Sequence, residues 1–218
     1  MDERLLPWMF AVETQADLLN RFDAAVINRA AIDKESGKPK KFTEAVPDFR
    51  AFYGLKQGTA GKFIKDKPDI FAQVCYDLFK EEPADLAEAN ERWQAAVAQL
   101  KTEATSELKS ATMKAYWFFH PTKLTMYDRL AQKGMASHLK ARAGGKRAKP
   151  TVNWRNFLSY FQDIYDENKA TIQEAITFSG TGYPYPMRVL DKYLWLQGNK
   201  DRDDYLDCYA LSRQLRGK

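Results

Sequence analysis

The chain has 218 residues, of which 44% are hydrophobic and 13% aromatic, which is enough for a packed core in one domain of ordinary size. Its net charge of +5 is small, so a preference for a polyanion would have to come from how the charges are arranged. The two cysteines exclude a disulfide scaffold and a four-cysteine metal site, and we expect both thiols, Cys75 and Cys208, to be buried. No uninterrupted apolar run approaches the length of a membrane span, so we expect a cytoplasmic protein without membrane contact.

The first quarter of the chain has helical periodicity broken by loops. An amphipathic helix is predicted over Thr14–Ile32, after an apolar patch that Pro7 interrupts. A charged Gly/Pro loop is expected over Asp33–Lys41, followed by a short helix over Asp48–Tyr53. The glycine-containing stretch Tyr53–Phe63 lacks the spacing of an NTPase phosphate loop, so we expect a turn or a helix start there.

Prolines and apolar spacing mark the next helices. Pro68–Phe79 and Pro83–Leu100 each begin with proline near the first turn, where the missing N–H costs nothing. A third helix is predicted over Ser106–Phe119 and should end at His120, because Pro121 disfavours the helical conformation of the residue before it. The last four residues of this helix are aromatic, which is typical of a buried element or of one that faces a ligand pocket.

The second half of the chain is also helical by its pattern. The predicted helices run over Arg129–Arg142, Val152–Phe178, Met187–Leu196 and Arg202–Gln214. We find no alternating strand pattern and no internal repeat, so the fold class is predicted to be all-α with about eight to ten helices. We expect a single compact domain over residues 1–218, or two helical lobes of about 1–105 and 106–218 with a pocket between them.

The charges are unevenly placed between Leu108 and Gln162. An even spread of the 29 acids would put about seven in this window, but Asp128 is the only one. The window carries the following basic residues: Lys109, Lys114, Lys123, Arg129, Lys133, Lys140, Arg142, Lys146, Arg147, Lys149 and Arg155. One carboxylate among many cations suits electrostatic or acid/base work on a polyanion, but Asp128 also stands where a helix N-cap belongs. The sequence leaves both interpretations open.

The segment from Lys114 to Arg129, KAYWFFHPTKLTMYDR, resembles the catalytic part of the helix-hairpin-helix DNA glycosylase superfamily, especially its 8-oxoguanine-glycosylase-like members. The later segment from Tyr185 to Trp195 is similar to a helix near the C-terminus of such proteins. The resemblance implies that Asp128 is the catalytic aspartate and Lys114 the catalytic lysine, with Lys109 as the alternative lysine. The glycine-containing hairpin of the family is not found before Lys114, so the hairpin is expected to be degenerate or absent.

A glycosylase would flip its target base out of the duplex into a pocket with stacking walls. The candidate pocket residues are Trp117, His120, Tyr183, Tyr185, Arg188 and Trp195. The candidate phosphate-binding residues are Lys109, Arg129, Lys140, Arg142, Lys146, Arg147 and Lys149. Arg188, Asp191 and Trp195 share one helix face, either as an ion pair packed by the indole or as a pocket wall. We expect no metal and no cofactor, since only His120 and His138 could join carboxylates in a metal site.

Two functions follow from this pattern. The first is a monomeric DNA glycosylase that acts on double-stranded DNA with a damaged or modified base, in repair or in defence against phage with modified DNA. The second is a non-catalytic helical module that binds DNA or RNA, in which Asp128 only caps a helix.

Overall fold

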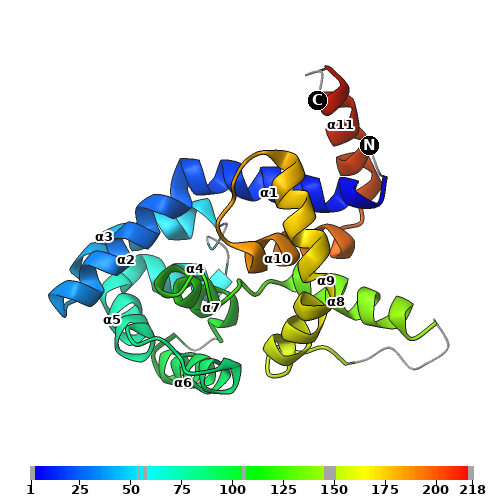
Figure 1. Ribbon diagram of the computed structural model, residues 1–218. Helices are drawn as coiled ribbons and strands as arrows, with labels where there is room; N and C mark the ends of the chain where they lie inside the picture. The colour runs from blue at the N-terminus through cyan, green and yellow to red at the C-terminus, as the bar shows by residue number, and fades with distance from the viewer. Residues whose placement is uncertain (1–2, 54, 56–57, 105–106, 145–150, 216–218) are drawn as a thin grey trace. The chain divides into compact units, whose positions relative to one another are not determined.

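The computed structural model describes residues 3–53, 55, 58–104, 107–144 and 151–215 (Figure 1). Within these ranges the chain is helical and contains no strand, so the all-α class is confirmed. The contacts group the chain into two compact units. The middle unit is Leu19–Met126, and the terminal unit combines Met1–Leu18 with Tyr127–Lys218. The lobes expected from the sequence, about 1–105 and 106–218, therefore differ from these units at both ends of the middle unit.

The middle unit contains a π-helical turn and six α-helices among the described residues. They are η2 (Leu19–Asp23), α2 (Ala24–Ser36), α3 (Lys40–Phe52), α4 (Gly58–Asp66), α5 (Pro68–Phe79), α6 (Leu86–Ala104) and α7 (Lys109–Phe119). The terminal unit contains the short 3-10 turn η1 (Glu3–Leu5), α1 (Leu6–Leu18), α8 (Arg129–Arg142), α9 (Phe157–Ser179), α10 (Pro186–Gly198) and α11 (Arg202–Leu215).

Helix α7 forms the centre of the middle unit. Every residue from Ala111 to Phe119 is buried, so this helix has no solvent-facing side over two and a half turns. The ring of Tyr116 stacks on Phe79 of α5 with centroids 4.0 Å apart. Trp93 of α6 donates its Nε1 proton to the Thr112 hydroxyl at 3.0 Å, which satisfies the indole inside the core. The aromatic run at the end of α7 is therefore buried.

The end of α7 is held by a buried histidine. His120 is 3% exposed, and its Nε2 lies 2.6 Å from the carbonyl oxygen of Phe79, so this nitrogen carries the proton and donates. Burial lowers the pKa of His120 and keeps the ring neutral. The predicted end of the helix at His120 is confirmed, since α7 stops at Phe119.

A buried carboxylate joins α2 to α3. Asp33 is fully buried and accepts the backbone N–H groups of Lys41 at 2.8 Å and Phe42 at 2.6 Å, two donors of the first turn of α3. The expected loop Asp33–Lys41 was thus too long, because α2 continues to Ser36 and α3 begins at Lys40. The short helix expected from Asp48 was also wrong, since α3 runs through Pro47 and buries a stripe beginning at Phe42.

Helices α8 and α10 of the terminal unit touch backbone to backbone. A Cβ atom on Gly134 of α8 would lie 1.8 Å from the carbonyl oxygen of Leu194, and one on Gly198 of α10 would lie 2.0 Å from that of Leu130. No side chain fits at either position, so the two glycines set how closely these helices approach.

Helix α1 packs against α10 and α11. Trp8 stacks on Tyr193 of α10 with centroids 3.8 Å apart, and Glu13 forms an ion pair with the buried Arg213 of α11. The sequence placed the start of this helix at Thr14, but α1 begins at Leu6. Pro7 stands in the first turn, where its missing N–H breaks no helical hydrogen bond.

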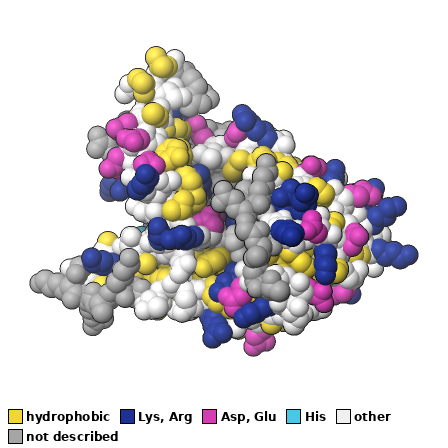
Figure 2. Space-filling model, turned by 180° about the vertical axis from the view of Figure 1, so that it is seen from behind, with side chains coloured by type: hydrophobic (Ala, Val, Ile, Leu, Met, Phe, Trp, Pro, Cys, Tyr) yellow, Lys and Arg dark blue, Asp and Glu magenta, His cyan; other side chains and the backbone are white. Residues whose placement is uncertain are grey.

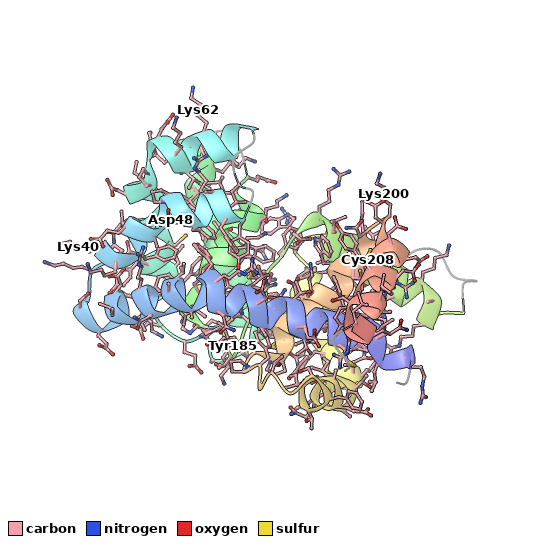
Figure 3. All side chains as sticks on the ribbon, turned by 90° about the horizontal axis from the view of Figure 1, so that it is seen from above. Lys40, Asp48, Lys62, Tyr185, Lys200 and Cys208 are labelled. Atoms are coloured by element: carbon pink, nitrogen blue, oxygen red, sulfur yellow. The ribbon has the colours of Figure 1, made fainter. Side chains whose placement is uncertain are left out.

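The two cysteines differ in environment. Cys75 is buried in α5, as expected, whereas Cys208 is exposed on α11 (Figure 3). The prediction for Cys208 was wrong because α11 buries only the stripe formed by Leu206, Tyr209 and Arg213, and Cys208 lies off that stripe.

Candidate functional site

Asp128 caps helix α8. Its backbone is extended, with φ −146° and ψ 172°, and its Oδ1 accepts the backbone N–H of Ala131 at 2.8 Å. The N-cap interpretation of Asp128 is therefore confirmed as a structural fact. The side chain is half-buried, and the hydrogen bond to Ala131 fixes its orientation at the positive end of the helix dipole. A capping carboxylate of this kind still has a second oxygen that can face a ligand or water.

The charge of Asp128 acts on the amine of Lys192 in α10 and raises its pKa. Its Nζ lies 3.4 Å from the ring centroid of Trp195 and 5.6 Å from that of Phe10. Burial and then the charge of Arg188 lower the pKa of Lys192 to about 8, while the charge of Asp128 acts in the opposite direction. Sequence reasoning missed this lysine. The three-residue spacing to Trp195 was a signal for it, but Phe10 and Asp128 come from other helices.

Arg188 and Asp191 form an ion pair inside the terminal unit. Each residue is 4% exposed, and the guanidinium donates to Oδ2 of the carboxylate. The pair is the structural alternative expected from their spacing on α10. Trp195, grouped with them by sequence, has its ring against Lys192 and also contacts Tyr205 with centroids 5.7 Å apart.

Lys114, the lysine implied by the resemblance, lies in the middle unit, whereas Asp128 lies in the terminal unit. Lys114 is 6% exposed, and its Nζ donates to the Ser110 hydroxyl at 2.6 Å and lies 5.9 Å from the Tyr53 ring. The phenol of Tyr53 in turn donates to the buried Asp23 at 2.5 Å. The alternative Lys109 is half-buried and forms an ion pair with Glu107.

The candidate pocket residues fall in two places. Trp117 and His120 are enclosed in the core of the middle unit, at 0% and 3% exposure. Tyr183 and Tyr185 precede α10 in the terminal unit, where their rings meet edge to face with centroids 5.8 Å apart. Tyr183 is buried and Tyr185 is half-buried.

Acidic residues outside the segment from Leu108 to Gln162 form ion pairs with several of its cations. Besides Lys109, Lys123 pairs with Glu82 at 3.4 Å and Arg142 pairs with Glu167 at 2.6 Å. Arg129 and Lys140 are exposed on α8. Figure 2 shows basic and acidic side chains interspersed on the face it presents. The candidates Lys146, Arg147 and Lys149 lie outside the described residues.

An open hollow of about 310 Å³ lies in the middle unit. Phe118, Phe119 and Pro121 contribute apolar wall, and Lys34 and Glu35 of α2 add charge. This hollow was not predicted, since it forms between segments far apart in the sequence.

Comparison with models of known protein families, with curated proteins and with solved structures gives no match to this chain. None of the described helices is long and apolar enough to cross a membrane. In the same part of the chain, no three His, Cys, Asp or Glu residues are grouped so that they could hold a metal ion.

Proposed function

We propose that this protein is a DNA glycosylase in which Asp128 stabilises the positive charge that develops on the sugar. The single observation that carries the proposal is that Asp128, the only acid of a cation-rich segment, is fixed by Ala131 and acts electrostatically on Lys192. Breaking an N-glycosidic bond passes through an oxocarbenium-like sugar, and an oriented carboxylate lowers the energy of that state.

The resemblance over residues 114–129 supports the same function, and with it a glycosylase-like arrangement of helices. The cation-rich segment supports binding to double-stranded DNA through phosphate contacts. Arg129 and Lys140 are the described candidates for these contacts, because both are exposed on α8, the helix that Asp128 caps. The target base would be extruded from the stack, as for other enzymes that act on a base.

The proposal is tested with DNA duplexes that each carry one damaged or modified base. After incubation with the protein, hot alkali cleaves the strand wherever a base has been removed. We expect cleavage at the modified position of at least one duplex and none with a folded Asp128→Asn variant. If the parent protein binds the duplexes but releases no base from any of them, the glycosylase proposal is wrong.

A non-catalytic module that binds DNA or RNA is the second candidate. The hydrogen bond from Ala131 to Asp128 favours it, because capping alone accounts for an aspartate at this position. This function predicts salt-dependent binding without base release by either the parent protein or the Asp128→Asn variant.

A further inference from the structure

The open hollow of the middle unit combines apolar walls with two opposite charges. Four residues of α2 line it, at spacings that place them on one face of the helix: Ile27, Ala31, Lys34 and Glu35. The remaining lining residues come from the end of α7 and the turn after it: Phe118, Phe119 and Pro121. The volume of about 310 Å³ is at the lower end of the range of small-molecule sites, about 300 to 1,000 Å³.

Neighbouring residues hold these walls in place. The ring of Phe118 meets that of Phe49 edge to face with centroids 5.7 Å apart, and Phe119 meets Phe42 in the same way at 5.1 Å. The last turn of α2, which carries the two charged lining residues, includes Asp33, whose carboxylate accepts two backbone N–H groups of α3. A ligand would therefore meet walls that are already ordered, which lowers the entropic cost of binding.

The two charged side chains of the hollow have no partner of their own. Lys34 and Glu35 are both exposed, and within the described part of the chain neither forms an ion pair, with the other or with a third residue. Their charges sum to zero, so the rim does not select for an anion or for a cation alone. A ligand that carries one anionic and one cationic group matches both side chains.

We propose that this hollow binds a free α-amino acid with a large apolar side chain. The ligand carboxylate pairs with Lys34, the ligand ammonium pairs with Glu35, and the apolar side chain lies against Ile27, Phe118 and Phe119. The inference goes beyond the proposed glycosylase function and does not depend on it, because none of the lining residues is a candidate for that function.

The chain has only two histidines, and they provide a readout. His120 stands between two lining residues of the hollow, whereas His138 lies on α8 in the terminal unit. Burial lowers the pKa of His120 most, and the charge of Lys34 lowers it further, so this ring senses the charge at the hollow.

The experiment adds L-phenylalanine to the full-length protein and follows the ring signals of both histidines by NMR. We expect the His120 signal to shift along a saturable curve with a Kd on the order of 1 mM, while the His138 signal stays in place. No shift of the His120 signal at a concentration on the order of 10 mM overturns the inference, as does an equal shift of both signals.

Ligands that each lack one group test the match of charges and of apolar surface. Hydrocinnamate lacks the ammonium and phenethylamine lacks the carboxylate, so each should bind about threefold more weakly than L-phenylalanine, as expected for the loss of an exposed ion pair. Glycine lacks the apolar side chain and should bind at least about tenfold more weakly. Hydrocinnamate or phenethylamine binding as tightly as L-phenylalanine would rule out an amino acid as the ligand.

Four variants assign the groups. Lys34→Gln should bind L-phenylalanine and phenethylamine equally, and Glu35→Gln should bind L-phenylalanine and hydrocinnamate equally. Ala31→Leu fills part of the hollow and should abolish binding. Lys40→Gln is the matched control and should keep the parent affinity, because Lys40 is exposed at the start of α3 and points away from the helices (Figure 3). Parent-like preferences in both charge variants, or parent-like affinity in Ala31→Leu, would contradict the proposed site.

Discussion

Asp128 is both a cap and a candidate catalyst, and one substitution separates the two roles. Asparagine keeps the oxygen that accepts the N–H of Ala131, so Asp128→Asn should change the free energy of unfolding by only about 0.3 kcal/mol. A neutral amide cannot stabilise a cationic sugar, so the rate of base release should fall by a factor on the order of 100 or more. Single-turnover excision and urea unfolding of the two proteins measure both effects.

The same variant should bind intact DNA as tightly as the parent protein or more tightly. Asp128 repels phosphate before the reaction and helps only when positive charge develops on the sugar. Fluorescence anisotropy with an uncleavable duplex measures this affinity. A folded Asp128→Asn protein that excises at the parent rate would remove Asp128 from the mechanism.

Lys192 should make stability depend on pH. Its pKa is about 8 in the folded chain and near its ordinary value of 10.5 in the unfolded chain, so the unfolded chain binds more protons between these values. The free energy of unfolding should therefore rise with pH over this window. Lys192→Met removes the cost of a buried charge and should stabilise the protein by about 1 kcal/mol at pH 7, with a gain that shrinks toward pH 10. Urea unfolding at about pH 7 and pH 9.5 measures this gain. Lys200→Met is the control, and its difference in stability from the parent protein should be the same at both pH values.

The contact between helices α8 and α10 depends on two glycines, Gly134 and Gly198. Gly134→Ala would place a Cβ atom 1.8 Å from the carbonyl oxygen of Leu194, so the helices must separate. We expect a loss of about 2 kcal/mol or more in the free energy of unfolding, although alanine favours helix formation in isolation. Ser137→Ala, at an exposed position of the same helix, is the matched control and should change stability by less than about 0.5 kcal/mol. Equal stability of the two variants would contradict the close contact.

The sequence predicted those elements whose signals are local. The bounds of α5 follow from Pro68, and those of α8 from Asp128 at its start. The start of α3 could not be predicted in this way, because its first N–H groups are satisfied by Asp33, which the sequence pattern assigned to a loop. Propensity arguments likewise assign a break to Pro47, and only the buried stripe that begins at Phe42 explains why the helix continues through it.

The candidate site was likewise predictable only where its signals are local. Asp128 was identified because its signal, an acid before a helical pattern, lies within a few residues. Lys192 looked like one more charged residue on an amphipathic helix. Its pKa is lowered first by burial and then by the charge of Arg188 on the same helix, while the charge of Asp128 opposes the shift. Phe10 of α1, whose ring centroid lies 5.6 Å from Nζ, and Asp128 are not linked to Lys192 by any spacing along the chain.

For the whole molecule, the ion pairs determine which cations are available to a polyanion. Lys123 and Arg142 already have acidic partners, whereas Arg129 and Lys140 are exposed on α8. We expect DNA affinity to fall steeply with salt, and each of Arg129→Ala and Lys140→Ala to make the slope of log affinity against log salt less negative by about one. Lys123→Ala should leave the slope nearly unchanged. Several phosphate contacts should lower the affinity about 10³-fold between about 50 and 200 mM salt. An affinity that is flat over this range would contradict phosphate binding.

Because Lys192 lies over Trp195, we expect the fluorescence of this indole to depend on whether Lys192 carries its proton. A positive charge 3.4 Å from the indole centroid perturbs the excited state of the ring, and that charge disappears when Lys192 loses its proton. The intrinsic emission should therefore change along a one-proton curve centred near pH 8, well below the range in which surface lysines titrate. The curve should vanish in Trp195→Phe and in Lys192→Met. In the parent protein its midpoint should move when an anionic ligand binds beside the amine, so that occupancy of the site can be followed by fluorescence without a label.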